Sequence, residues 1–161
     1  MHYIILFLFI LINTGCGFHF QKNIFSETEK KELQLNSNKQ YSYFIKTLIE
    51  QLKIKNFDLS KTNRNTPILN IINFFEDTRT LSIFCDGKAA EKQLIFTINT
   101  ELIINNNKFY KLNNKIERTF FENNLKALAK DTEKDTIMQE MQEEAIHNLI
   151  HNLLFIYSHK K

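Results

Sequence analysis

Residues 91–104 alternate apolar and polar side chains, and this pattern limits the possible folds more than any other feature of the chain. Successive side chains of a β-strand point to opposite faces, so the alternation predicts a strand with one buried face. The asparagines at 105–107 suit a tight turn, because asparagine tolerates positive φ. A second alternating run follows at residues 109–121, and the two runs together predict a long β-hairpin. The expected buried positions of the first strand are Leu94, Phe96, Ile98, Thr100 and Leu102.

Two other segments repeat their apolar residues at helical spacing. Residues 42–55 predict an amphipathic helix, with Asn56 as a left-handed stop. Thr132 and Asp135 resemble a capping box, after which a long helix is expected to continue to about Ile156. Its expected apolar stripe consists of Met138, Met141, Ala145, Ile146, Leu149, Ile150, Leu153 and Leu154.

The remaining strands are shorter or less regular. The apolar, β-branched run at residues 68–75 predicts a buried strand, and residues 32–35 give a weaker strand signal. Residues 76–90 are expected to form a loop or the tip of a hairpin around Asp86 and Gly87. With 161 residues the chain fits one domain. The order of elements predicts an α+β fold, with two helices packed on one face of a mixed four-stranded β-sheet in a two-layer sandwich.

The first residues indicate processing rather than folding. Residues 3–12 are uninterruptedly apolar, which is shorter than the roughly 20 residues needed to span a bilayer as a helix. Small residues then precede Cys16, as in a lipobox. We therefore expect a signal peptide at residues 1–15, cleavage before Cys16, a lipid on the Cys16 thiol and a mature domain at residues 16–161. Only Cys85 then remains, which leaves no internal disulfide.

Charge is divided unevenly along the chain. Residues 79–130 contain nine Lys or Arg against five Asp or Glu, whereas residues 131–157 contain six acidic residues and one lysine. A basic sheet region on a secreted domain suits phosphate-bearing lipid or an acidic partner, and nucleic acid is not expected there. An ordinary solvated surface explains the same composition equally well.

Three groups of residues have the chemistry of a catalytic or metal site. His147 and His151 have the spacing that binds zinc from a helix, but no third ligand or adjacent glutamate accompanies them. Glu117 and Glu122 have no fixed separation that would suggest a carboxylate pair. No histidine or aspartate is spaced to activate Cys85. We therefore expect no enzyme activity, no metal and no cofactor.

Several strings taken together resemble one family, the LPS-assembly lipoprotein LptE, formerly rare lipoprotein B. The strings are CGFH at 16–19, SIFCDGKAAE at 82–91, RTFF at 118–121, ALAKD at 127–131 and MQEM at 138–141. They follow the family's order and spacing, and the similarity covers most of the chain from Cys16 to about Leu154.

The resemblance implies a non-enzymatic lipoprotein of a Gram-negative outer membrane, anchored on the periplasmic side. Its domain would lie as a plug inside the LptD β-barrel in a 1:1 complex and bind lipopolysaccharide (LPS), for assembly at the outer leaflet. In the family, LPS contact involves a lysine after the last strand, matched here by Lys130, and an arginine in the central loop, where this chain has Cys85. Lys88 and Arg79 are the candidates to replace that arginine.

Two alternatives remain, one for the position of Arg118 and one for the function of the protein. Arg118 shares the parity of Ile116 and Phe120, the face expected to be buried, so either a bulge turns it outward or an acidic side chain pairs with it. Its role is structural or ligand-binding. The alternative overall role is a lipoprotein chaperone or pilotin that escorts another outer-membrane protein without touching LPS.

Overall fold

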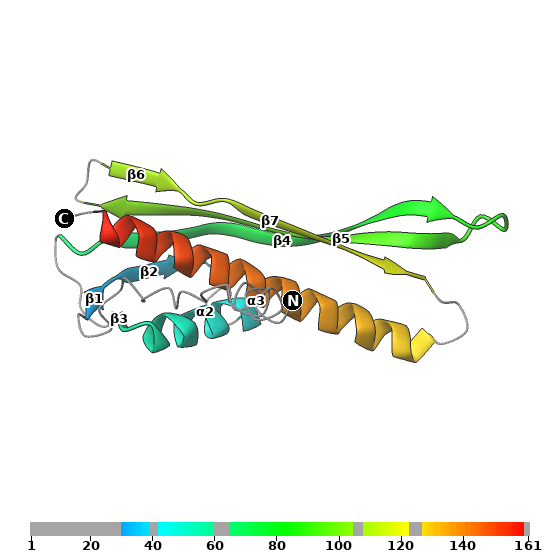
Figure 1. Cartoon of the computed structure of the whole chain (residues 1–161), viewed down its shortest axis with the longest axis horizontal. Helices are drawn as coiled ribbons and strands as arrows, with labels where there is room; N and C mark the ends of the chain where they lie inside the picture. Colours follow the sequence, from blue (N-terminus) through cyan, green and yellow to red (C-terminus); the bar gives the residue numbers. More distant parts are fainter. Residues whose placement is uncertain (1–29, 39–41, 60–64, 105–107, 123–126, 160–161) are drawn as a thin grey trace, which may run out of the picture.

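The computed structural model describes residues 30–38, 42–59, 65–104, 108–122 and 127–159, with the backbone alone described for residues 127–130. Helices α2 and α3 both lie on one face of an elongated sheet (Figure 1). The elements in chain order are β1 (Lys31–Glu32), β2 (Gln34–Ser37), α2 (Tyr43–Ile54), β3 (Phe57–Asp58), β4 (Ile68–Ile83), β5 (Ala89–Ile104), β6 (Lys108–Lys111), β7 (Asn114–Phe121) and α3 (Ala127–Ser158).

The sheet is mixed, and β5 is its central strand. β2 pairs in parallel with β4, and β4 pairs antiparallel with β5. On its other side β5 pairs antiparallel with β6 and then with β7, so these two strands share one position across the sheet. The predicted α+β fold with two helices on one face is confirmed, with the expected fourth strand divided in two.

Thr100 lies at the division between β6 and β7. Its carbonyl oxygen accepts from the Leu112 N–H at 2.9 Å, and its hydroxyl donates to the Leu112 carbonyl oxygen at 2.6 Å. Thr100 is fully buried. A buried hydroxyl without a partner would be costly, so these two bonds stabilise the chain at the interruption between β6 and β7.

β4 and β5 form a longer hairpin than the sequence pattern indicated. Residues 76–83, expected to belong to a connection, pair with β5 from Glu76 opposite Phe96 to Ile83 opposite Ala89. The side chains of β4 from Phe75 onward are exposed on both faces. A strand that is solvated on both faces needs no apolar alternation, which is why this part of β4 could not be recognised.

The core lies between the helices and the inner face of β5. All five residues expected on the buried face of β5 are fully buried, and the α3 stripe from Met138 to Leu153 is also buried. Phe44 of α2 packs against Phe74 and Phe96, with ring centroids 4.9 and 5.4 Å apart. The two helices therefore cover the face that the alternation predicted to be buried.

Helix α2 begins and ends where the sequence predicted, whereas helix α3 begins earlier than predicted. The Ser42 hydroxyl caps α2 by accepting from the Ile45 N–H at 3.3 Å, and Asn56 follows in the left-handed conformation with φ 62°. α3 begins at Ala127, so Thr132 is an interior residue rather than an N-cap. The Thr132 carbonyl accepts the Thr136 hydroxyl at 2.8 Å. Alanine and leucine at 127–129 favour helix strongly enough to extend it upstream.

The last turns of α3 attach to the first strand. The Tyr157 hydroxyl donates to the Glu32 carbonyl oxygen at 2.8 Å, and its ring meets Phe57 edge-on at 5.5 Å. Phe57 belongs to β3, which pairs in parallel with β1. Burial, and to a smaller extent the Glu32 carboxylate, raises the pKa of the Tyr157 phenol well above its ordinary value of about 10.

Candidate functional site

The hairpin tip, residues 81–88, joins β4 to β5 and extends beyond the N-terminal end of α3 (Figure 1). Its turn is closed by the Gly87 N–H, which donates to the Phe84 carbonyl at 2.9 Å, and by the Phe84 N–H, which donates to the Lys88 carbonyl at 2.8 Å. Gly87 has φ +81°, a left-handed conformation that a side chain would strain. Cys85 lies in this turn with an exposed, free thiol.

The cations predicted to bind LPS near this tip already have acidic neighbours. Lys88 Nζ lies 3.2 Å from Asp86 Oδ2, and Arg79 Nε lies 3.5 Å from Asp77 Oδ2. All four side chains are about half-exposed or more. Such pairs contribute little to stability and exchange partners readily, so both cations remain accessible to an anionic ligand.

The tip also exposes large apolar side chains, which the sequence analysis did not single out. Leu81 and Phe84 are about half-exposed, Ile83 is 66 % exposed and Phe121, which pairs with Glu91 beside the tip, is 75 % exposed. Several exposed large apolar side chains close together in the chain are typical of a binding site. The signal in the sequence is the placement of Leu81, Ile83 and Phe84 beside the turn residues Asp86 and Gly87, although residues 76–90 were expected to form a loop or the tip of a hairpin.

Lys130 is placed differently from the sequence expectation. It was expected between the last strand and the helix, but its backbone belongs to the first turn of α3, which starts at Ala127. The chain reaches α3 from the base of the tip, where the Glu122 N–H donates to the Ala90 carbonyl at 2.9 Å. Close by, Lys92 Nζ donates to Glu122 Oε1 at 2.8 Å on the helix side of the sheet.

Arg118 pairs with an acidic side chain. This was one of the two arrangements expected for a charged residue on the buried side of the strand. It lies opposite Leu94 on the helix-facing side of β7, and its Nη2 donates to Glu144 Oε2 of α3 at 2.6 Å. The two side chains remain 47 % and 43 % exposed. The pair therefore joins strand to helix at the rim of the core, and Arg118 is not a buried unpaired charge.

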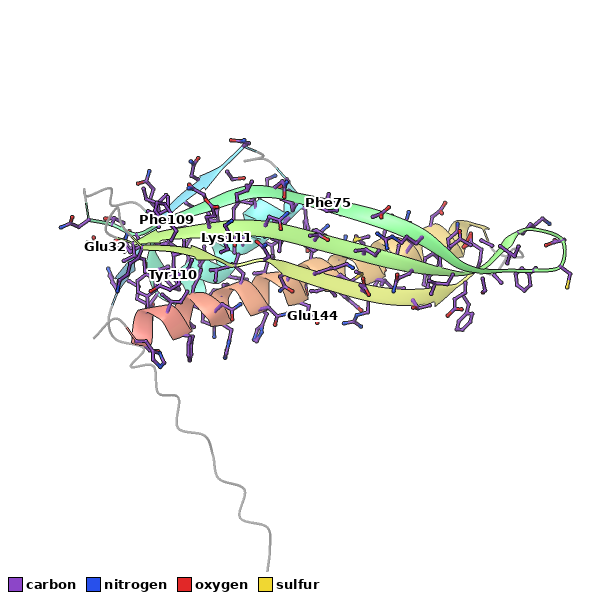
Figure 2. All side chains as sticks on the ribbon, turned by 90° about the horizontal axis from the view of Figure 1, so that it is seen from above. Glu32, Phe75, Phe109, Tyr110, Lys111 and Glu144 are labelled. Atoms are coloured by element: carbon purple, nitrogen blue, oxygen red, sulfur yellow. The ribbon has the colours of Figure 1, made fainter. Side chains whose placement is uncertain are left out.

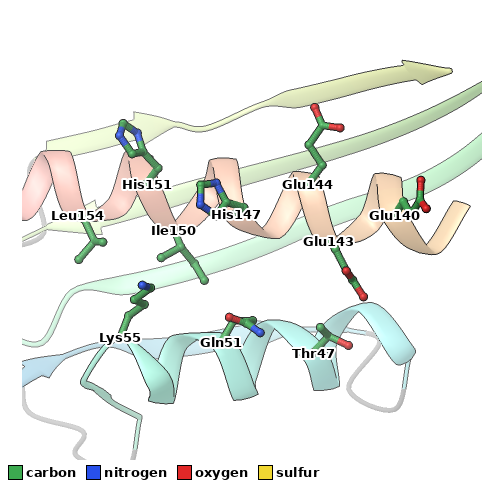
Figure 3. Close-up of a pocket in the computed structure, with 10 residues that line it drawn as sticks. All are labelled: Thr47, Gln51, Lys55, Glu140, Glu143, Glu144, His147, Ile150, His151 and Leu154. Carbon is green, nitrogen blue, oxygen red and sulfur yellow. The ribbon is translucent and has the colours of Figure 1, made fainter. Parts of the chain in front are cut away.

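A concave surface lies between the two helices. It is a groove of about 690 Å³ with Ile150 and Leu154 among its lining residues, and Lys55 faces it from α2 (Figure 3). The α3 side carries Glu140, Glu143, Glu144, His147 and His151 (Figure 3). Among the described residues, no three potential ligands lie close enough together to hold a metal ion.

The outer face of the sheet, opposite the helices, exposes Phe75 of β4 and Phe109 of β6 beside Lys111 (Figure 2). Cys16 and the preceding residues lie outside the part of the chain that the structure describes. None of the described helices is long and apolar enough to cross a membrane.

Comparison with known proteins identifies relatives over most of this architecture. The family model described as LptE, lipopolysaccharide-assembly, matches residues 31–153. The LPS-assembly lipoprotein LptE of Photorhabdus laumondii is 37 % identical over 131 residues, covering 81 % of this chain and 72 % of the relative. The protein of the same name from Pectobacterium atrosepticum is 36 % identical over 133 residues, with the same coverage.

Solved structures show the same fold at lower sequence identity. Rare lipoprotein B from Shewanella oneidensis superposes with a TM-score of 0.75 at 22 % identity, over 80 % of this chain and 98 % of that one. Lipoprotein B from Nitrosomonas europaea superposes with a TM-score of 0.66 at 16 % identity, over 81 % and 86 %. The length of the matched region and the identity to the curated relatives show that this chain belongs to the LptE family of lipopolysaccharide-assembly lipoproteins, which are non-enzymatic accessory proteins.

Proposed function

We propose that this chain is an outer-membrane lipoprotein, anchored through a lipid on Cys16, that plugs the LptD β-barrel and binds LPS at its hairpin tip. The observation that carries the LPS proposal is the mixed chemistry of the tip. Ile83 and Phe84 expose apolar surface within a few residues of the cations Arg79 and Lys88. LPS combines phosphates with acyl chains, so one tip offers partners to both parts of the ligand.

Lys130 is the proposed second contact to an LPS phosphate. It is the residue matched to the family's lysine, and its backbone stands in the first turn of α3, which the chain enters from the base of the tip. An ammonium in a partly shielded groove forms a charge-assisted contact with a phosphate, whereas a fully solvated one contributes far less.

Cys85 makes the proposed site weaker than one with an arginine in the turn. A thiol is a poor hydrogen-bond donor, whereas a guanidinium can hold a phosphate with two parallel bonds. Arg79 and Lys88 supply charge nearby, but each already has a carboxylate within 3.5 Å. A phosphate that binds either cation must therefore compete with that carboxylate.

The barrel proposal rests on the family together with the surface of the domain. The helix layer offers an acidic groove lined by Glu140, Glu143 and Glu144, and the opposite face of the sheet exposes Phe75 and Phe109. A plug enclosed by a barrel contacts it on several sides. An obligate complex of this kind typically buries more than about 2,000 Å².

Affinity capture from membranes tests the barrel proposal. The tagged protein, extracted in mild detergent, should retain one large β-barrel protein in a 1:1 ratio, because obligate interfaces survive extraction. Recovery of a different outer-membrane protein, such as a secretin, without LptD would favour the chaperone or pilotin alternative. Recovery of no barrel would contradict the plug.

LPS binding by charge variants tests the tip. Lys130→Asp should weaken LPS binding by about ten- to a hundredfold, the loss expected for one charge-assisted contact. Cys85→Arg should strengthen it by about tenfold. Lys46→Asp, an equal charge change at an exposed position of α2, is the control and should bind like wild type. The effects should shrink at high salt. If Lys130→Asp binds LPS as wild type does, the headgroup site lies elsewhere.

A further inference from the structure

An ion pair between Lys92 and Glu122 lies where the hairpin tip joins the rest of the sheet. Lys92 Nζ donates to Glu122 Oε1 at 2.8 Å. The Glu122 side chain is 6 % exposed and that of Lys92 is 28 % exposed. Among the described residues, Glu122 is the one buried carboxylate. A buried carboxylate without a cation would be costly, so Lys92 and Glu122 stay together in the folded protein.

The pair stands beside the last row in which three strands are paired. Glu91 of β5 lies opposite Ser82 of β4 and Phe121 of β7. Beyond this row, in the described part of the chain, only β4 and β5 continue as a two-stranded ribbon towards the tip (Figure 1). Two-stranded ribbons twist more than wider sheets and are barely stable alone. The direction of the tip is therefore set by the contacts at its base.

The same junction is the point from which the chain continues to α3. Glu122 is the last described residue before Ala127, where α3 begins. Among the described side chains of α3, the buried ones begin at Met138. Lys130 stands midway in the sequence between Glu122 and Met138. Glu122 is therefore the buried residue that constrains the start of the helix from the side of the sheet.

Stability alone does not require charges at this junction. Apolar side chains of similar volume in place of a buried ion pair often leave a protein equally stable or more stable. A charge-assisted hydrogen bond differs from an apolar contact because it fixes the direction of both side chains. The bond between Lys92 and Glu122 joins β5, which continues into the tip, directly to the segment that leads to α3.

We propose that Lys92 and Glu122 are positioning residues, whose ion pair holds Lys130 and the tip cations Arg79 and Lys88 at the separation needed to bind one LPS molecule together. The inference rests on the proposed function, because it takes Lys130 as a contact to an LPS phosphate. Lys92 does not contact the ligand, since its ammonium is held by Glu122. The pair acts through Lys130, so its effect on LPS binding must disappear when the Lys130 ammonium is removed.

Replacing both partners tests this role without leaving a buried charge unpaired. Full-length protein with Lys92→Met and Glu122→Leu should be at least as stable as wild type in urea, but should bind LPS about five- to tenfold more weakly. Lys115→Met with Glu117→Leu is the matched control, because it removes an exposed ion pair of β7, and should bind like wild type. A large loss of stability in the first variant would assign the pair to the fold and overturn the inference.

Removing Lys130 separates positioning from a general effect on the site. In a Lys130→Ala background, Lys92→Met with Glu122→Leu should change LPS affinity by less than about twofold, because the group to be positioned is absent. Lys92→Arg, which keeps a cation beside Glu122, should bind within about twofold of wild type. Equal losses with and without Lys130, or wild-type affinity of the apolar pair, would overturn the inference. If Lys130→Ala alone binds LPS as wild type does, the proposed Lys130 contact is itself wrong, and the positioning role falls with it.

Discussion

The Asp86 carboxylate limits how much positive charge Lys88 can offer to a ligand at the hairpin tip. Asp86 accepts the Lys88 backbone N–H at 3.1 Å with Oδ1 and holds Lys88 Nζ at 3.2 Å with Oδ2. It therefore has a structural role in the turn and an electrostatic role toward the lysine. Asparagine keeps the acceptor oxygen and removes the charge, so one substitution separates the two roles.

Asp86→Asn should raise LPS affinity by about two- to fivefold, because the Asp86 carboxylate then no longer competes with an LPS phosphate for the Lys88 ammonium, and an exposed ion pair is weak. The turn should persist, since the side-chain oxygen can still accept from the Lys88 N–H. LPS titration at low and high salt measures the effect, with Asp135→Asn on exposed helix surface as the control. Equal affinity of wild type and Asp86→Asn would mean that Lys88 does not contact LPS.

The Tyr157 phenol links stability to alkaline pH. Its pKa is raised in the folded protein, mainly by burial, so the folded state retains the proton that an unfolded tyrosine loses near pH 10. The stabilisation is complete below the unfolded pKa of about 10 and is lost as pH rises above it.

Tyr157→Phe should therefore be less stable than wild type at pH 8, having lost the bond to Glu32, but should lose less stability between pH 9 and pH 11. Chemical denaturation across this range measures both effects. Tyr43→Phe, at a half-exposed position, should follow wild type. A Tyr157→Phe variant whose stability falls as steeply as that of wild type would remove Tyr157 as the cause.

At the level of elements, segments with one buried face could be predicted from the sequence, whereas a strand exposed to solvent on both faces could not. Residues 91–104 and the α3 stripe each have one buried face, and their periodicity revealed both the element type and the buried side. The distal part of β4 is exposed on both faces, so its sequence has no apolar periodicity that would predict a strand. The hairpin tip, with its exposed Ile83 and Phe84, was hidden for the same reason.

Contacts between distant elements were beyond the sequence pattern. Parity placed Arg118 on the helix-facing side of its strand, but only the packing of α3 against β7 identifies Glu144 as its partner. The break at Leu112 and Asn113 was likewise invisible, because alternation continues on either side of it. At this break the Leu112 backbone bonds to Thr100 of the neighbouring strand, a contact that the sequence pattern could not reveal.

Thr100→Val should destabilise the protein by about 1–3 kcal/mol, because it leaves the Leu112 carbonyl without its hydroxyl donor in a buried setting. The shape of the side chain is nearly unchanged, so packing is preserved. Thr97→Val, on the outer face of the same strand, should change stability by less than about 0.5 kcal/mol. Urea denaturation compares the two variants. Equal effects would show that the hydroxyl bond is not what stabilises the break between β6 and β7.

For the molecule as a whole, the elongated domain is expected to reach its partner only once it is held at a membrane. The described helices offer no membrane-spanning segment, and the anchor is proposed to be the lipid on Cys16. Two or more acyl chains bind a bilayer stably, since each buried methylene contributes about 0.8 kcal/mol. Lipidation therefore governs whether the other proposed contacts can form.

Cys16→Ser should abolish incorporation of labelled palmitate and release the protein from the membrane fraction, because serine has no thiol to accept the diacylglycerol. Cys85→Ser is the matched control: it removes the other cysteine, exposed in the hairpin turn, and should label like wild type. Sequencing of the mature wild-type protein should find Cys16 at its modified N-terminus. If Cys16→Ser still incorporates palmitate, or if the mature chain begins at another residue, the proposed anchor is wrong and the domain must be brought to its barrel in another way.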